Sequence, residues 1–117
     1  MLSKSKPFRK VYIACGRTDL RNGINGLATK IKFEYNLDPF DEGTLFIFCG
    51  IKTNCIKGLL WEGDGFLMLV KRLENGRYQW PRSSNELKEM TPEQYDLLIS
   101  GFTIEPTINK ATCKEII

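Results

Sequence analysis

The first third of the chain shows two different spacings of apolar residues. KVYIAC (10–15) is rich in β-forming residues and predicts a strand. Thr18 or Asp19 would cap the helix expected after it, although Gly23 and Gly26 each cost about 1 kcal/mol relative to alanine inside a helix. The helix therefore either starts late or uses the glycines to let another backbone come close. Its apolar stripe recurs at helical spacing and consists of Ile24, Leu27, Ala28, Ile31 and Tyr35.

The middle of the chain predicts consecutive strands. TLFIFC (44–49) is apolar on both faces, which is typical of a central, buried strand. Two further segments, CIKGLLWEG (55–63) and FLMLVKRL (66–73), flank the turn sequence Gly-Asp-Gly (63–65). This arrangement predicts an antiparallel hairpin.

A second tight turn, Glu-Asn-Gly (74–76), leads into RYQW (77–80), which predicts another strand that ends at Pro81. The period-two alternation of a strand puts Tyr78 and Trp80 on one face. Their polar neighbours then lie on the other face.

The last clear elements are a short strand and a helix. Residues 82–90 begin as a polar link and predict a short strand at their end. Thr91 is a favourable N-cap, Pro92 suits the first helical position, and Gln94 completes a capping box. Gly101 is the expected end of this helix.

These elements predict an α+β domain: a small, mostly antiparallel sheet of about four to six strands, with two main helices packed on one face. The chain of 117 residues is long enough for one core and too short for two. We expect a flexible basic arm (1–9), a single domain (10–104) and a part-ordered tail (105–117).

Composition places the chain among globular proteins and adds a charge asymmetry. Apolar residues make up 42% and charged residues 26%. No apolar run reaches the roughly 18 residues of a membrane span, and residues 1–10 lack the features of a signal peptide, so we expect a cytoplasmic protein that does not contact a membrane. Residues 1–82 hold 14 Lys/Arg and 8 Asp/Glu, whereas residues 83–117 hold 3 and 6. A basic body with an acidic C-terminal part suits both a polyanion and a basic partner.

The residue types argue against catalysis. The chain has no histidine, which removes the usual proton shuttle and nucleophile activator. Its four cysteines show no metal-binding spacing and are expected to be structural. Asp19, Asp38, Asp41 and Asp64 lie in sequences where turns and caps favour aspartate. We therefore expect no catalytic residue, no metal and no cofactor, with a metal-dependent nuclease as a remote alternative.

The loop after the first strand has a possible phosphate-binding role. It contains Arg17 and Arg21 before a helix start, where free N–H groups can hold an anion. However, it lacks the lysine and hydroxyl residue of a P-loop. The alternative is that these arginines form surface or capping pairs with Asp19.

Cations and aromatics interleave along the hairpins, as in proteins that contact phosphates and stack on bases. Against this, aromatics on a small sheet are more often core residues with solvated charges opposite them, and a protein-interaction role stays equally open. The candidate DNA- or partner-binding residues are Arg9, Lys10, Arg17, Arg21, Lys52, Lys57, Lys71, Arg72, Arg77, Arg82 and Trp80.

Four blocks of the sequence resemble one protein family: "VYIACGRTDLRNGINGLA", "LDPFDEGTLFIFC", "IKGLLWEGDGFLMLVKRLENGRYQWP" and "MTPEQYDLLISG". They are similar to the TnpB-type accessory protein of a large bacterial insertion-sequence family, the small second reading frame that precedes the transposase. The similarity covers residues 8 to 104.

The resemblance implies a non-catalytic accessory factor in transposition that binds DNA at the element ends, the larger catalytic transposase, or both. It implies that the catalytic acidic residues belong to that transposase. Arg17 and Arg21 become the first candidates for phosphate or partner contact. The chain departs from its relatives at residues 50–55, where Lys52 is the only cation in a turn that is usually arginine-rich. The alternative is a protein adaptor with no DNA binding of its own.

Overall fold

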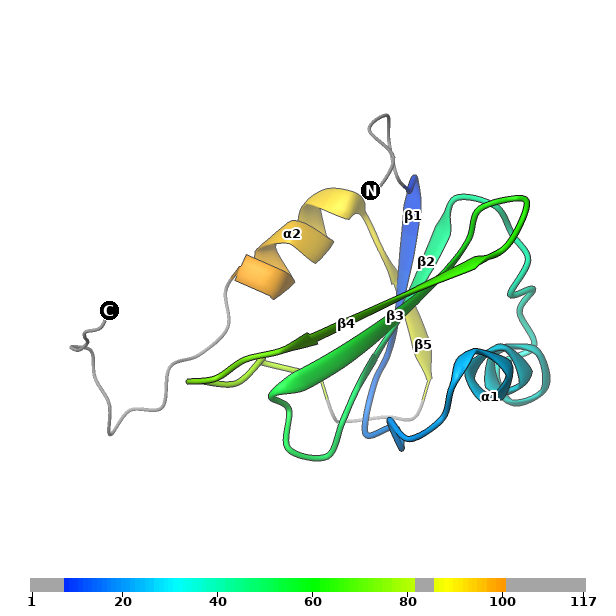
Figure 1. Ribbon diagram of the computed structural model, residues 1–117. Coiled ribbons are helices and arrows are strands. Elements are labelled where there is room, and N and C mark those ends of the chain that lie inside the picture. The colour runs from blue at the N-terminus through cyan, green and yellow to red at the C-terminus, as the bar shows by residue number, and fades with distance from the viewer. Residues whose placement is uncertain (1–7, 82–85, 101–117) are drawn as a thin grey trace.

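The computed structural model describes residues 8–81 and 86–100, which form a five-stranded sheet with a helix on each side (Figure 1). The strands lie in the order β4-β3-β2-β1-β5. β1 and β2 are parallel, and the other three pairs are antiparallel. This confirms a small, mostly antiparallel α+β sheet. The strands are β1 (Lys10–Ala14), β2 (Thr44–Cys49), β3 (Cys55–Trp61), β4 (Phe66–Arg72) and β5 (Leu87–Met90).

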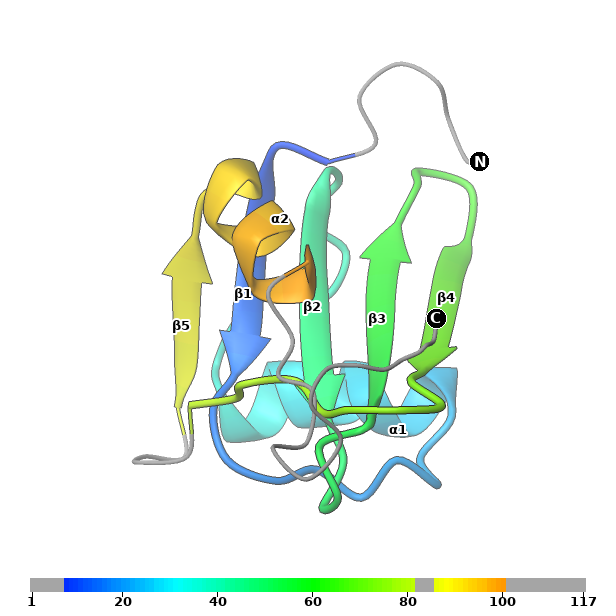
Figure 2. The same ribbon diagram turned by 90° about the vertical axis from the view of Figure 1, so that its left-hand side faces the viewer.

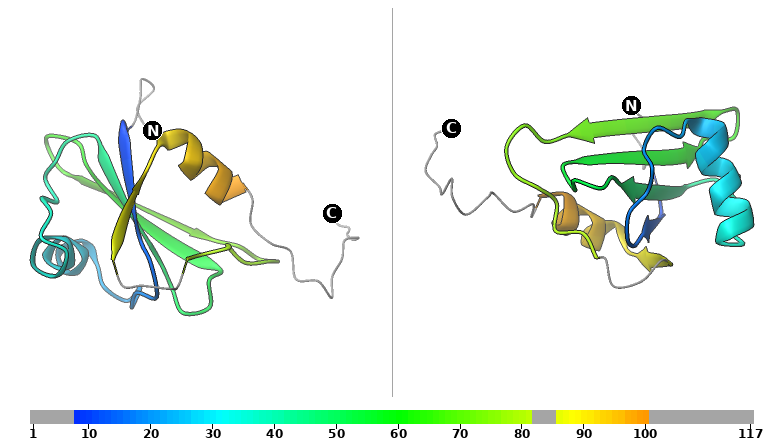
Figure 3. Two further views of the ribbon diagram at one scale, coloured as in Figure 1. Left: turned by 180° about the vertical axis from the view of Figure 1, so that it is seen from behind. Right: turned by 90° about the horizontal axis from the view of Figure 1, so that it is seen from below.

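The two helices cover opposite faces of the sheet, so the prediction that both pack on one face is wrong (Figures 1 and 3). α1 (Ile24–Thr29) continues into a π-helical turn, η1 (Lys30–Glu34), and α2 (Pro92–Ser100) follows β5. All six residues of β2 are buried. A strand that is apolar on both faces needs a cover on each side, and that is the physical reason for the arrangement.

Each face of the sheet has its own core cluster. On one face, Leu27 and Ile31 of the first helix pack against Phe46 and Phe48 of β2. On the other face, Tyr95, Leu98 and Ile99 of α2 pack against a cluster that includes Val11, Ile13, Leu45 and Ile47. The predicted apolar stripe of the first helix is confirmed, because Leu27 and Ile31 are fully buried. The late start is also confirmed, since the helix begins at Ile24.

The segment 77–80 differs from its predicted structure. It forms no strand and has only an isolated bridge at Arg77. The backbone N–H of Tyr78 donates to the carbonyl oxygen of Thr53 (2.8 Å) in the β2–β3 turn. The predicted alternation survives, because Tyr78 and Trp80 are buried and their two polar neighbours are exposed. Side-chain burial thus follows the period-two pattern even though this segment makes no ladder.

The C-terminal elements agree with the sequence. The hairpin of β3 and β4 and the short strand β5 are present. The capping box of α2 is complete: the N–H of Gln94 donates to Thr91 Oγ1 (3.1 Å), and the N–H of Thr91 donates to Gln94 Oε1 (2.9 Å). The predicted helix end at Gly101, most of the predicted basic arm and the predicted tail lie outside the described residues. No helix in the described part of the chain is long and apolar enough to cross a membrane.

Candidate functional site

Three loops meet at the end of the sheet where β1 and β2 finish (Figure 2). They are the β1–α1 loop (15–23), the β2–β3 turn (50–54) and the segment after β4 (73–81). Backbone hydrogen bonds hold them together: Thr18 N–H to Cys49 O (2.9 Å) and Gly16 N–H to Pro81 O (2.8 Å). The hydrogen bond from Tyr78 N–H to Thr53 O joins the segment after β4 to the β2–β3 turn. This end of the sheet is therefore a connected surface built from three distant parts of the sequence.

Five of the predicted cationic residues lie in or beside these loops, and we call them the basic end: Arg17, Arg21, Lys52, Arg72 and Arg77. Lys52 and Arg77 line one hollow of about 250 Å³, together with Asn54, Asn75 and the acidic residue Glu74. Cationic and amide groups are the side chains that most often contact phosphate and sugar oxygens. The structure thus brings together residues that sequence alone could only name separately.

Two arginines of the basic end are already ion-paired. Arg21 donates from Nε (2.9 Å) and Nη2 (2.7 Å) to the carboxylate of Asp19. These hydrogen bonds and the adjacent positive charge lower the pKa of the exposed Asp19 carboxyl to about 2. Arg72 pairs more loosely with Glu74 (3.5 Å). The expected pairing of Asp19 with an arginine of its loop is confirmed.

Arg17 and Lys52 differ from these two arginines in their ion pairing. Both side chains are exposed. Neither forms an ion pair with a carboxylate among residues 8–81 and 86–100. A bound phosphate would therefore not have to displace a carboxylate from either cation.

Other predicted residues lie elsewhere. Lys57 is half-buried, and its Nζ donates to the carbonyl oxygen of Asn22 (3.1 Å), which braces the β1–α1 loop against β3. Arg9 and Lys10 lie at the opposite end of β1, where Arg9 pairs with Asp41 (3.2 Å). Lys71 lies in β4 beside α2. Arg82 lies outside the described residues.

Trp80 is a core residue, and its expected role as a binding or stacking group conflicts with its position. Its side chain is only 7% exposed, and its Nε1–H donates to the carbonyl oxygen of Ala14 (2.8 Å). Tyr78 packs beside it at a ring-centroid distance of 6.5 Å. Trp80 alternates onto the core side of the segment, so its ring has no free face for a base. The sequence already contained this signal, because the alternation put Tyr78 and Trp80 together.

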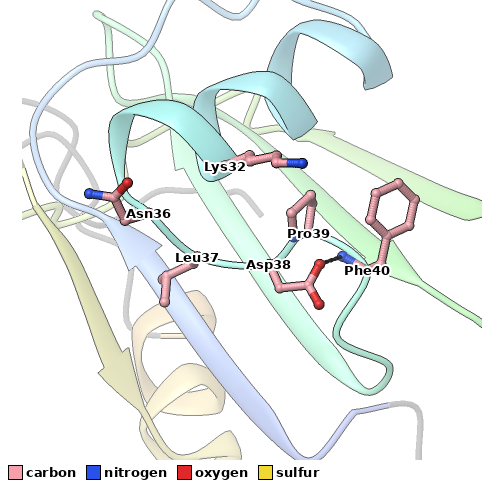
Figure 4. Close-up of a pocket in the computed structure, with 6 residues that line it drawn as sticks. All are labelled: Lys32, Asn36, Leu37, Asp38, Pro39 and Phe40. Carbon is pink, nitrogen blue, oxygen red and sulfur yellow. Dashed lines mark hydrogen bonds between the residues drawn. The ribbon is translucent and has the colours of Figure 1, made fainter.

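A second hollow, of about 410 Å³, lies in the loop after η1 and was missed by sequence reasoning (Figure 4). Lys32 and Asp38 contribute its charged groups. Asp38 Oδ1 accepts a hydrogen bond from the backbone N–H of Phe40 (2.9 Å), as in an Asx turn (Figure 4). That carboxylate stabilises the loop, and the hollow assembles no set of catalytic groups. Its remaining lining residues are Asn36, Leu37, Pro39 and Phe40.

Asp41 and the described cysteines have structural rather than metal-binding surroundings. Asp41 accepts hydrogen bonds from Arg9 and from Thr44 Oγ1 (2.8 Å). Cys15 and Cys49 are buried, and Cys55 is half-buried. Residues 8–81 and 86–100 contain no group of three His, Cys, Asp or Glu side chains that could hold a metal ion. The geometry of this part gathers cations at one end of the sheet and assembles no metal centre.

Comparison with known proteins identifies one family and two relatives. Residues 9–109 match the family model described as "IS66 Orf2 like protein". The chain is similar to the uncharacterized protein y4hO of Sinorhizobium fredii, with 36% identity over 92 residues, which is 79% of each chain. It is also similar to the uncharacterized protein y4jC of the same organism, with 29% identity over 86% of this chain and 85% of the relative. No solved structure matches the chain.

Proposed function

The chain belongs to the family of IS66 Orf2-like proteins, and from that membership we propose that it is an accessory factor in the transposition of a bacterial insertion sequence. In this proposal it binds DNA at the ends of the element through the basic end. This binding would take place in the bacterial cytoplasm, where the DNA is. Cutting and joining of strands belongs to the larger transposase.

The basic end is the observation that carries this proposal. Its cations come from three loops that are tied together by backbone hydrogen bonds. Lys52 and Arg77 line one hollow with two asparagines. A rigid set of cations can neutralise several phosphates at once and release their counterions. The asparagine amides can hydrogen-bond phosphate oxygens or base edges.

The proposal includes no catalytic step. Two of the aspartates considered for a metal site, Asp38 and Asp41, accept hydrogen bonds that stabilise their loop. The protein would act by holding DNA in place while the transposase reacts.

The experiment is a titration of labelled duplex carrying an element end at several salt concentrations. Contact between the five cations and phosphates predicts that the logarithm of the binding constant falls linearly with the logarithm of salt, with a slope of about −3 to −5. A scrambled duplex of equal length measures the non-specific part. No retention of the element-end duplex at low salt would count against DNA binding.

A second candidate function is that of a protein adaptor that binds the transposase without touching DNA. An apolar groove of about 240 Å³ between α2 and the β3–β4 hairpin favours it. Leu97 of α2 is also 73% exposed. Uncovered apolar surface of this kind often marks a protein-binding site. Co-purification with the transposase after nuclease treatment, together with no retention of DNA by the chain alone, would support this candidate over the first.

A further inference from the structure

β4 forms an edge of the sheet, and within residues 8–81 and 86–100 no strand pairs with its outer side. The strand is seven residues long and starts with five apolar residues in a row (66–70). Proteins usually protect a long apolar edge with charge, proline or a bulge, because its free backbone groups invite another strand. In β4 the two charged residues, Lys71 and Arg72, stand together at one end.

The register of the hairpin determines which backbone groups face outwards. Glu62 N–H donates to Gly65 O (2.9 Å) and Leu73 N–H donates to Asn54 O (2.7 Å), at the two ends of the ladder. Hydrogen-bonded and non-bonded pairs alternate along an antiparallel ladder, so the β4 residues bonded to β3 are Leu67, Leu69 and Lys71. The residues whose backbone N–H and C=O groups point away from the sheet are Phe66, Met68, Val70 and Arg72.

Side chains at this edge are also uncovered. Val70 is 59% exposed and Leu69 is 38% exposed. Both border the apolar groove, whose far wall is formed by Tyr95 and Ile99 of α2. Free backbone groups and apolar side chains therefore occur on the same strand, and they suit a second strand better than water.

We propose that two copies of this chain pair through β4, antiparallel and about a two-fold axis at Leu69, to form one continuous sheet. In that register Leu69 faces its own symmetry mate, and Met68 faces Val70 of the second copy. Each outward-pointing backbone group of the strand then finds a partner, as in an isologous interface.

The distribution of charge favours a second copy as the occupant. Antiparallel pairing about Leu69 puts Lys71 across from Leu67 and Arg72 across from Phe66, so no two cations are opposed. A register centred on Lys71 would place the two lysines directly opposite each other. The strand has a basic end and begins at a hairpin tip that carries Glu62 and Asp64. In an antiparallel pair, the basic end of each strand lies beside the acidic hairpin tip of the other copy.

Phe66 offers Arg72 of the second copy a second interaction. Its ring lies in an aromatic cluster with Trp61 (centroids 4.9 Å apart) and Phe40 (5.2 Å). A guanidinium over such a ring gains a cation–π attraction. This cluster at the tip of the hairpin is otherwise half exposed, because Phe40 is 52% exposed.

Sedimentation equilibrium of the full chain without DNA tests the pairing, so the outcome does not depend on the proposed function. The monomer mass is 13.4 kDa, and we expect the average mass to rise towards twice that value with concentration. Val70→Lys adds a third cation at the edge and should raise the dissociation constant about tenfold or more. Leu97→Lys makes the same change on the exposed surface of α2 and should leave the mass curve unchanged.

Amide hydrogen exchange of the wild-type chain gives a readout that needs no variant. Pairing predicts that the amides of Met68 and Val70 become more protected as concentration rises. A monomer mass at every concentration overturns the proposal. Protection that does not change with concentration would then show that another segment of the same chain covers the edge. A dimer that Val70→Lys leaves intact places the interface elsewhere and also overturns it.

Discussion

Trp80 donates its indole N–H to the carbonyl oxygen of Ala14 across 66 positions of the chain, and both residues are buried. This bond fastens the segment after β4 to the end of β1. It thereby holds two of the three loops that carry the basic end. Trp80, which the sequence offered as a candidate binding residue, instead packs in the core beneath the proposed binding surface.

Trp80→Phe should destabilise the fold and leave DNA contact unchanged. The change leaves the buried carbonyl of Ala14 without its donor and removes part of the ring, at a cost of about 1–3 kcal/mol in the free energy of unfolding. Urea denaturation measures this cost, and retention of duplex well below the melting temperature measures binding. Full stability combined with weakened retention would mean that the ring contacts DNA after all.

Asp19→Asn should strengthen DNA retention. It removes the carboxylate charge that pairs with the Nε and Nη2 groups of Arg21, and the guanidinium becomes available to a phosphate. One additional phosphate contact predicts a salt slope steeper by about one. Asp64→Asn, at the exposed hairpin tip, makes the same change of charge away from the basic end and serves as the control. Equal effects of the two variants would show that only net charge matters.

The raised pKa of the Tyr78 phenol leads us to expect a loss of stability at high pH. Burial raises the pKa of its phenol to about 12 in the folded chain, while the hydroxyl finds no hydrogen-bond partner among the described residues. The unfolded chain releases this proton near pH 10, so the folded state binds more protons between pH 10 and about 12. Stability contributed by this group is therefore fully present below pH 10 and falls as pH rises through that window.

Tyr78→Phe isolates that contribution from the other groups that titrate at high pH. The difference in the free energy of unfolding between wild type and variant should change by about 2–3 kcal/mol from pH 9 to pH 12. Urea denaturation at each pH measures it. A difference that stays constant over this range would show that the phenol is not held protonated by the fold.

Local patterns predicted the elements of this fold well, and their arrangement less well. The capping box of α2, the β3–β4 hairpin and the apolar stripe of the first helix all follow from short-range chemistry. The side of the sheet on which each helix packs depends on contacts between distant segments. The double-sided burial of β2 was the available clue, and the prediction of one helical layer did not use it.

The proposed binding surface could be predicted only in part for the same reason. Charge and residue type identified Lys52 and Arg77 as candidates, but their shared hollow arises from the fold. Arg9 and Lys10 have the same chemistry and lie at the other end of β1. A sequence shows which residues are charged, but only the topology shows at which end of the sheet each charge lies. Trp80 shows the converse case, because its period-two position already indicated burial.

The most direct test of the account compares two double variants that each remove two cations. Lys52→Ala with Arg77→Ala removes both cations that line the hollow of the basic end. Arg9→Ala with Lys10→Ala removes equal charge from the opposite end of β1. Retention of element-end duplex is measured across salt concentrations, after circular dichroism has shown that both variants are folded. We predict that the first pair weakens binding at least several-fold and reduces the salt slope by about two, while the second pair has little effect. Equal losses, or a larger loss from the second pair, would contradict a DNA-binding basic end.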